Sequence, residues 1–343
     1  MSGDVVTRLG IIGCGRIAQA YAQAASDSTT VRIAAVADVN GAAAAEFAAP
    51  LGAAVYHDHL ALIGSGAIDG VLIATPPSTH VDVALDAIAF GIPTLCEKPF
   101  ALRPADASKM VHAAREAGVL LTMASKYRYV ADVARATQLV KAGLIGDPIQ
   151  ADVCFAGHVD MSSRWNSDPT VSGGGVLIDN GAHAVDLIRS FLGPIDTVLA
   201  TADDRRSTPG VEDTAIVVVR LVSGTLATIR LSWSYDSMEP AFLTLYGDTG
   251  ALRLGWGESS YRGDVSGEWH TFGHGYDKVR ALRSQLEEFG DAIDSGRPLR
   301  ITDEDALASV CVIDAAYRSL DSGTWAVVEH PSLDVEVRLP SAS

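Results

Sequence analysis

Three residues that could move protons stand at two separate places in the chain. Lys98 lies in the motif Glu97-Lys98-Pro99, directly after an apolar run typical of a buried strand. Asp179 and His183 lie four residues apart in a helix-like segment, so they share a face, and we expect Asp179 to set the tautomer and pKa of His183. A desolvated lysine and an acid-paired histidine are both groups used in general acid–base catalysis. The alternatives are a strand end that reaches solvent and a structural histidine on an amphipathic helix.

The helix-like segment that carries Asp179 and His183 has two further features. It is opened by three consecutive glycines, 173–175, and Asp186 extends the face shared by the acid and the histidine. Core packing alone does not explain a helix that presents Asp, His and Asp on its inner face. The segment therefore favours an active site over a purely structural element.

Residues 7–18 join a strand-like run to a helix-like run through a glycine-rich turn. Gly13, Gly15 and Ala18 fit G-x-G-x-x-G/A, in which the backbone approaches a pyrophosphate at a helix N-terminus. Asp38 ends the second strand-like run, 25 residues after Gly13, where a carboxylate accepts hydrogen bonds from an adenosine ribose and repels a 2′-phosphate. The alternative for Asp38 is an N-cap of the next helix. Because no arginine directly follows Asp38, the sequence favours NAD over NADP.

The loop Thr75-Pro76-Pro77 follows a third strand-like run. In an open parallel sheet this loop and the Glu-Lys-Pro motif lie on the carboxyl edge, where ligands bind. A rigid proline turn, with Ser78 or Thr79 capping the next helix, would explain the loop equally well.

The order of the expected elements divides the chain in two. In the first third, short apolar runs alternate with helix-like segments, which indicates a parallel sheet covered on both faces. Later β-like runs, with turns at 222–225 and 247–250, predict a mainly antiparallel sheet. We expect a Rossmann dinucleotide-binding domain over 1–125 and a second α/β domain, built on an open antiparallel sheet, over 126–343. The helix-like segments are 16–25, 41–48, 80–90, 104–117, 132–142, 177–192, 278–295 and 303–322.

Composition and charge exclude several classes of partner. The 343 residues carry a net charge of −16 with a pI near 4.8, so no basic excess is present to neutralise nucleic acid or an anionic membrane. The four cysteines stand apart in apolar surroundings, which favours buried thiols over disulfides. No further histidine or cysteine lies at ligand spacing from His183, so we expect no metal. Without a membrane-length apolar run or a leader-like opening, the sequence predicts a cytoplasmic protein.

Together these motifs resemble the glucose–fructose oxidoreductase, inositol dehydrogenase and rhizopine-catabolism family (Gfo/Idh/MocA). The resemblance covers nearly the whole chain, and it implies an NAD(P)-binding Rossmann domain, a C-terminal domain on an open antiparallel sheet, and a homodimer or homotetramer. The motifs that carry it are GIIGCGRIA at 10–18, ATPPSTH at 74–80, CEKP at 96–99, SGGGVLIDNGAH at 172–183 and FGDAIDSGRPLRITDEDALASV at 289–310.

The resemblance also implies roles for individual residues. It implies that Lys98, Asp179 and His183 are catalytic, with His183 receiving the proton of a substrate hydroxyl. The residues implied to line the cofactor are Gly13, Gly15, Arg16, Ile17, Asp38, Thr75, Pro76, His80 and Glu97. The residues implied to contact substrate are Lys98, Tyr127, Arg128, Arg164, Trp165, Asn166, Asn180 and His183.

Two stretches depart from the common family pattern. Residues 125–129 read SKYRY where relatives often carry asparagine before the basic and aromatic residues, and 164–166 read RWN where many have Trp-Arg. Both lie where the family shapes its substrate site, so the departures bear on the substrate rather than on the chemistry.

The implied reaction is oxidation of a secondary alcohol on a sugar or cyclitol by NAD, with NADP less favoured. The alternatives are a ketosugar reductase, a redox-neutral enzyme that retains its cofactor, and a non-catalytic regulator that senses the dinucleotide. The intact set of Lys98, Asp179 and His183 argues against the regulator, because a sensor has no need of all three.

Overall fold

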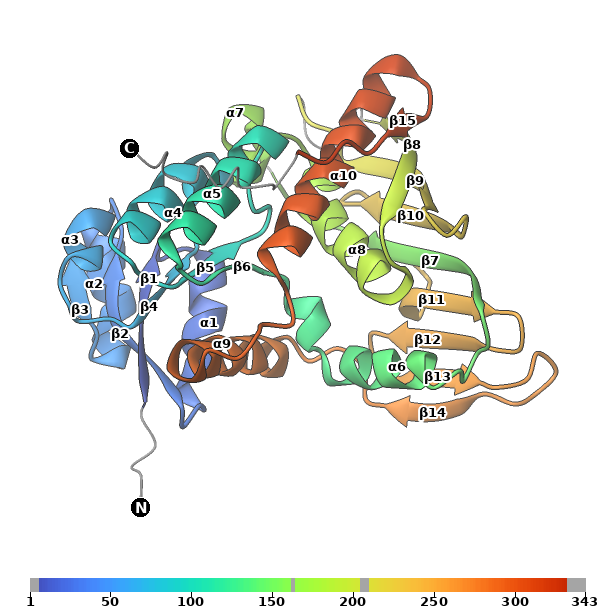
Figure 1. Cartoon of the computed structure of the whole chain (residues 1–343), viewed down its shortest axis with the longest axis horizontal. Coiled ribbons are helices and arrows are strands. Elements are labelled where there is room, and N and C mark those ends of the chain that lie inside the picture. Colours follow the sequence, from blue (N-terminus) through green and yellow to red (C-terminus); the bar gives the residue numbers. More distant parts are fainter. Residues whose placement is uncertain (1–5, 162–163, 204–209, 332–343) are drawn as a thin grey trace, which may run out of the picture.

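The computed structural model describes residues 6–161, 164–203 and 210–331, which form two units, each built on one sheet (Figure 1). The first sheet has six parallel strands in the order β3-β2-β1-β4-β5-β6. Its strands are β1 (Thr7–Ile12), β2 (Val31–Ala37), β3 (Ala54–Tyr56), β4 (Gly70–Ile73), β5 (Thr94–Glu97) and β6 (Leu121–Ala124). The strand order reverses between β1 and β4, and such a switch point is where open α/β sheets bind ligands.

Helices cover both faces of the parallel sheet, as the alternation of the sequence predicted. Successive residues of a strand point to opposite faces, so Leu9 and Ile11 pack in one apolar cluster and Ile12 in the other. One face is covered by α3 (His59–Ile63), α4 (His80–Ala89) and α5 (Pro104–Ala117). The other is covered by α1 (Arg16–Ser26), α2 (Gly41–Ala48) and α9 (Lys278–Ser295). The 3₁₀ turns of this unit are η1 (Ala49–Leu51) and η2 (Pro77–Thr79).

Helix α9 comes from the far end of the chain and completes the first unit. Its buried side chains Leu282, Leu286 and Phe289 join the same apolar cluster as β1 and β2. Gly290 permits the close approach, because a Cβ there would lie 2.8 Å from a methyl group of Val31. The predicted division at residue 125 placed this helix in the second domain, whereas its apolar face packs against the first.

The second sheet has nine strands in the order β14-β13-β12-β11-β7-β10-β9-β8-β15. Every neighbouring pair is antiparallel except β7 with β10, so the sheet is mixed but mainly antiparallel, as predicted. The predicted turns at 222–225 and 247–250 connect β9 to β10 and β11 to β12. The strands are β7 (Pro148–Ala156), β8 (Ile195–Asp203), β9 (Thr214–Leu221), β10 (Leu226–Ser232), β11 (Ala241–Gly247), β12 (Ala251–Gly255), β13 (Ser259–Arg262), β14 (His270–Gly273) and β15 (Ala326–Val327).

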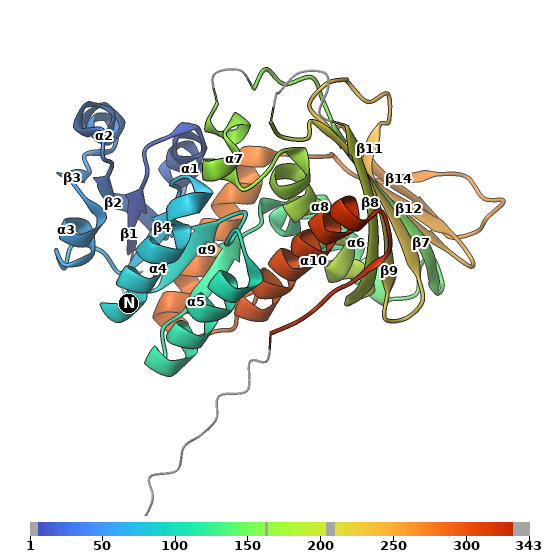
Figure 2. The ribbon, with the colours of Figure 1, turned by 90° about the horizontal axis from the view of Figure 1, so that it is seen from above.

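The remaining helices lie on one side of this second sheet, between it and the first unit (Figure 2). They are α6 (Ala131–Lys141), α7 (Pro169–Ser172), α8 (Val176–Leu192) and α10 (Asp303–Ser322), with the 3₁₀ turns η3 (Lys126–Tyr129) and η4 (Trp165–Ser167). Helix α8 contacts β7, β9 and β10, and α10 contacts α5, α8 and β8. Helix α8 therefore lies directly under the sheet, close to the segment that follows β6.

Within the three described ranges, no helix is long and apolar enough to cross a membrane. In the same ranges no group of three or more His, Cys, Asp or Glu side chains is arranged to hold a metal ion. All four cysteines are free and buried.

Candidate active site

The turn between β1 and α1 leaves open space where a pyrophosphate would lie. Gly13 has a φ of +94°, and a Cβ on it would lie 2.8 Å from the backbone of Ala74 and Thr75, so only glycine fits. A Cβ on Gly15 would meet nothing within 4 Å. The N-cap of α1 is Gly15, and no side chain caps this end of the helix. The backbone amides of the first turn of α1 are therefore available to a ligand. This turn therefore has the space and the free amides that the phosphates of a dinucleotide need, and the binding of cofactor by Gly13 and Gly15 stays a prediction.

Asp38 follows β2 and lies beside the glycine turn. Its carboxylate accepts hydrogen bonds from the backbone amides of Cys14 at 2.7 Å and Asn40 at 2.8 Å. Asn40, rather than Asp38, caps α2 by accepting a hydrogen bond from the amide of Ala43. Since each carboxylate oxygen has more than one acceptor site, Asp38 can still accept hydrogen bonds from ribose hydroxyls. Burial, with the nearby Asp38 carboxylate, raises the pKa of Cys14 to about 11, so this thiol stays protonated at neutral pH.

His80 does not face the expected cofactor space. The ring is fully buried, and its two nitrogens lie 2.9 Å from the carbonyl oxygens of Thr75 and Pro99. Burial lowers the pKa of this imidazole. The prediction that His80 lines the cofactor is therefore corrected: it ties the loop after β4 to the loop after β5. Thr75 and Pro76 themselves are half-buried, on the edge of the sheet next to the glycine turn.

Lys98 is held at the end of β5 by groups on both sides. The Lys98–Pro99 peptide bond is cis. The Glu97 carboxylate accepts hydrogen bonds from the Lys98 amide at 3.0 Å and from the hydroxyl of the buried Tyr21 at 2.8 Å. The Lys98 ammonium forms an ion pair with the carboxylate of Asp179 and donates to the Asp179 carbonyl at 3.1 Å. Both side chains of this pair are largely buried, so Lys98 points into the molecule rather than to solvent.

The expected pairing of Asp179 with His183 is not what the structure shows. Asp179 pairs with Lys98, whereas Nε2 of His183 lies 2.8 Å from Nζ of Lys126. Burial, and then the charges of Lys126 and Lys98, lower the pKa of His183 well below its ordinary value. The two residues do share a face of α8, as predicted, but each meets a lysine from a different strand end.

Lys126 also lies in the candidate site, although it was not among the residues predicted from the sequence. It opens the turn η3 just after β6, on the same edge of the sheet as Lys98. A lysine in the segment directly after a parallel strand, beside a strand ending in Glu-Lys-Pro, was the available signal. Within the SKYRY stretch, the resemblance assigns only Tyr127 and Arg128 to substrate.

Three glycines and a glutamate fix the position of the N-terminus of α8. A Cβ on Gly173, Gly174 or Gly175 would collide with Leu102, Tyr317 or the backbone of Glu212, respectively. The Glu212 carboxylate then accepts hydrogen bonds from the amides of Gly175 at 2.9 Å and Leu177 at 3.0 Å. This external cap satisfies amides that a helix start leaves free, and so holds the turn that carries Asp179.

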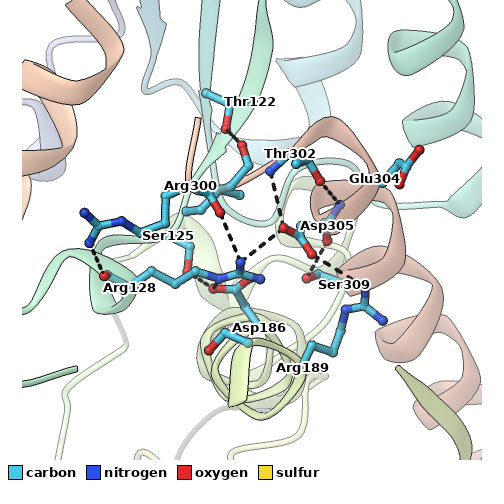
Figure 3. A network of polar contacts seen from close by, with 12 residues as sticks. Thr122, Ser125, Arg128, Asp186, Arg189, Arg300, Thr302, Glu304, Asp305 and Ser309 are labelled. Atoms are coloured by element: carbon cyan, nitrogen blue, oxygen red, sulfur yellow. Dashed lines mark hydrogen bonds and ion pairs between the residues drawn. The ribbon is translucent and has the colours of Figure 1, made fainter. Parts of the chain in front are cut away.

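Arg128 does not contact the site, although it was predicted to bind substrate. Its guanidinium makes two hydrogen bonds to Asp186, at 2.6 and 2.9 Å, and a third to Asp305 at 3.1 Å (Figure 3). Ser125 donates a further hydrogen bond to Asp186, whose side chain is fully buried. Although burial alone would lower it, these carboxylates raise the pKa of Arg128. Arg128 and Asp186 thus link η3, α8 and α10, and Asp186 does not extend the reactive face of the helix.

The other predicted substrate residues lie at several depths. The Tyr127 ring is buried, with its centroid 4.9 Å from that of His183 in an edge-on contact. Asn180 directs its amide towards the carbonyl of Phe155 at 3.5 Å. Arg164 is half-buried. Burial, and then the charge of Arg16, lower the pKa of its guanidinium, while the charge of Asp179 acts in the opposite direction. Asn166 is half-buried and Trp165 is exposed.

The site therefore gathers two lysines, an aspartate and a histidine beyond the carboxyl ends of β5 and β6. The groups are Lys98, Lys126, Asp179 and His183, and the contacts between them run in two pairs, Lys98 with Asp179 and Lys126 with His183. The glycine turn opens on the same edge of the sheet. Such an arrangement can bind a dinucleotide and donate or accept a proton next to its reactive end.

Comparison with known proteins gives matches along most of the chain. Residues 7–125 match the model of the oxidoreductase family with an NAD-binding Rossmann fold, and residues 133–253 match the GFO/IDH/MocA C-terminal domain. The rhizopine catabolism protein MocA of Rhizobium meliloti is 30% identical over 322 residues, which cover 91% of this chain and 95% of that protein. The inositol 2-dehydrogenase of the same species (strain 1021) is 28% identical over 92% of this chain and 97% of its own length.

Solved structures agree as well. An NAD-binding oxidoreductase from Klebsiella pneumoniae superposes with a TM-score of 0.85 at 25% identity, covering 95% of this chain and 100% of that one. The family models, the full-length relatives and the shared architecture lead to one conclusion. The chain belongs to the Gfo/Idh/MocA family of NAD-binding oxidoreductases.

Proposed function

We propose that this oxidoreductase interconverts a secondary alcohol and a ketone on a sugar or cyclitol, with Lys98, Asp179 and His183 at the reacting centre. The observation that carries the proposal is the gathering of proton-bearing side chains at the edge of the sheet onto which the glycine turn also opens. A bound nicotinamide would supply the hydride acceptor. The names of the relatives, a rhizopine catabolism protein and an inositol dehydrogenase, support a polyhydroxylated ring as substrate.

Each catalytic side chain has a task that follows from its contacts. The Lys98 ammonium, oriented by Asp179, is a hydrogen-bond donor for the substrate oxygen, and it stabilises negative charge as the O–H bond breaks. Burial and two nearby ammonium groups lower the pKa of His183, so its imidazole is neutral at neutral pH, which is the form that a proton acceptor needs. The ring of Tyr127 packs edge-on against the ring of His183 and so shields that side of the histidine from water. The same groups serve ketone reduction when the proton and the hydride move in the opposite direction.

A direct test is the absorbance at 340 nm of purified protein with NAD or NADP and a panel of inositols, hexoses and their glycosides. We expect at least one ring polyol to reduce NAD, and the His183→Asn variant to lose this activity. Failure of every polyol, together with NADH oxidation by a ketosugar, would assign the reductive direction. Firm NADH binding with no turnover in either direction would contradict the proposal and favour the dinucleotide sensor.

We expect a preference for NAD over NADP that depends on Asp38. In the Asp38→Ala variant the ratio of the Kd for NADPH to the Kd for NADH should fall by about 10-fold or more, because the carboxylate no longer repels a 2′-phosphate. Titration of cofactor fluorescence measures both constants. The Asn40→Ala variant, which removes the helix cap and leaves the carboxylate, serves as the control. An unchanged ratio in Asp38→Ala would show that Asp38 only braces the turn through Cys14.

The expected homodimer or homotetramer stays a proposal, supported by the outer face of the second sheet. There the exposed Leu226 and Tyr246 flank Gln150 in one row across three strands, and the exposed Ile216 lies on the neighbouring strand. A second copy would cover these apolar side chains. Light scattering at micromolar concentration should give a mass of at least two chains, and a monomer would contradict the proposal.

A further inference from the structure

Lys126 makes the one hydrogen bond that the structure gives to the His183 ring within the described residues. Its Nζ lies 2.8 Å from Nε2 of His183, and it also lies 5.0 Å from the centroid of the Tyr127 ring. The other ring nitrogen, Nδ1, is buried and has no hydrogen-bond partner there. Any proton that His183 handles at Nε2 must therefore be shared with the Lys126 amine.

The contact restricts how many protons the two side chains can hold. A charged lysine only donates hydrogen bonds, and a charged histidine donates from both nitrogens. If both were charged, two N–H groups would face each other across 2.8 Å, so the pair carries at most one positive charge. When Lys126 is charged, it occupies the lone pair of Nε2, and His183 cannot then take a proton from substrate. The pair accepts a proton only when both members are neutral.

We propose that Lys126 and His183 act as one proton-accepting pair, in which the proton from the substrate hydroxyl comes to rest on the Lys126 amine. The inference rests on the proposed function and deepens it, since His183 alone was expected to receive this proton. In the oxidative direction the carbinol C–H bond breaks and its electron pair leaves as hydride to the nicotinamide dinucleotide. The hydroxyl O–H bond breaks, an N–H bond forms on Lys126, and the ketone remains. The proton passes to solvent before the next turnover.

The charges around Lys126 suit this task. Two further cations face it, Lys98 at the end of β5 and Lys278 at the start of α9. Two carboxylates, Glu97 and Asp179, oppose them, and His183 makes direct contact. Burial, reinforced by the two cations, lowers the pKa of Lys126 to about 7. A substantial share of the pair is therefore neutral at neutral pH and able to accept a proton.

The sign of the pH dependence follows from this protonation scheme. Oxidation needs the neutral pair, so kcat/KM should rise with pH through a midpoint near 7 and level off about one pH unit above it. Reduction needs the protonated pair and should fall over the same range. A lysine that served only to hold His183 in place would give no such dependence.

The first experiment needs no substrate. The chain has five lysines, at 98, 109, 126, 141 and 278, so protein labelled with ¹³C at lysine Cε gives a simple spectrum, in which Lys126→Gln identifies the Lys126 signal. The exposed Lys109 and Lys141 are internal references. We expect the Lys126 signal to titrate with a midpoint near 7. A midpoint above about 9, in the range of an ordinary lysine, would overturn the proposal.

The second experiment uses turnover, once a substrate is known, and compares two replacements. Lys126→Arg keeps a permanent positive charge next to Nε2 of His183, so the rate of alcohol oxidation should fall about 100-fold or more at every pH. Lys126→Gln comes closest to keeping a neutral donor near Nε2 but cannot take a proton, so some activity should remain while the rise of kcat/KM near pH 7 disappears. A rise that stays in place in Lys126→Gln would overturn the proposal. If no alcohol or ketone is turned over, the proposed function fails, whereas the lysine titration still decides the protonation of Lys126.

Discussion

Replacement of Lys98 by methionine should lower kcat for hydride transfer by about 1,000-fold while the Kd for NADH changes by less than about 10-fold. Methionine has nearly the length of the lysine stem but neither donates a hydrogen bond nor carries charge. The Lys98 ammonium contacts the carboxylate and the carbonyl of Asp179, so its loss removes the donor for the substrate oxygen and frees the aspartate to move. Initial rates at saturating cofactor, with separate NADH titrations, measure the two effects.

Two controls decide what Lys98 contributes. Lys98→Arg keeps the charge but not the compact ammonium, and it should also lose most activity if a point donor is required. Lys109→Met removes a charge from the exposed face of α5 and should leave kcat within about twofold. Retention of more than about a tenth of the wild-type kcat in Lys98→Met would remove Lys98 from the reacting centre.

Replacement of Arg128 by methionine should lower the free energy of unfolding by about 3–5 kcal/mol. The change leaves the fully buried carboxylate of Asp186 without the cation that binds both of its oxygens. A loss of this size is a large share of the total stability of a typical protein, about 5–15 kcal/mol, so it should also show as a clearly lower Tm. Denaturant titration followed by tryptophan fluorescence gives the free energy, and calorimetry gives the Tm.

A double variant separates the lost pair from the lost packing. Arg128→Met with Asp186→Leu removes both charges and should recover much of the stability, because no unpaired charge then remains buried in the core. Arg103→Met, which breaks an ion pair to Asp106 on the surface, should cost no more than about 1 kcal/mol. A loss in Arg128→Met as small as in Arg103→Met would show that water reaches Asp186.

Local patterns were enough to predict much of the fold. The glycine turn, the position of Asp38 after β2 and the helices α2, α5, α9 and α10 follow from periodicity and turn chemistry, which act over a few residues. The elements β3, α3, β13, β14 and β15, of two to five residues, were not predicted, and neither was the nine-residue β8. Strands β4, β5 and β6 are equally short, but each is fully buried and lies in a clear apolar run, so they were predicted. Helix α9 itself was predicted with the observed bounds, whereas its position against the first unit was not, since a helix pattern shows which face is apolar but not what covers it.

The candidate site divides in the same way. Spacing correctly placed Asp179 and His183 on one face of α8, but it could not show that Asp179 contacts Lys98 and that His183 contacts Lys126. Arg128 and His80 were assigned to ligands because their motifs lie near the ligand edge. Both are instead buried and bound by the protein, Arg128 by carboxylates and His80 by backbone carbonyls. The contacts of Lys98, Lys126 and Arg128 join residues more than 50 positions apart, so they depend on the packed structure and cannot be read from one sequence. The contacts of His80 are closer in the chain, 5 and 19 positions away, but they too form only when two loops pack together.

Helix α9 has a consequence for the order in which the chain folds during synthesis. The six strands of the first sheet have been synthesised once residue 124 is added. One of the helices that cover a face of that sheet, α9, lies much later in the chain, at Lys278–Ser295. Until that helix emerges, Leu9, Ile33 and their neighbours lack the cover that Leu286 and Phe289 provide. The first unit therefore cannot finish folding until residues 125–295, about half of the chain, have been made, and the nascent chain must keep an apolar surface from aggregating during that time.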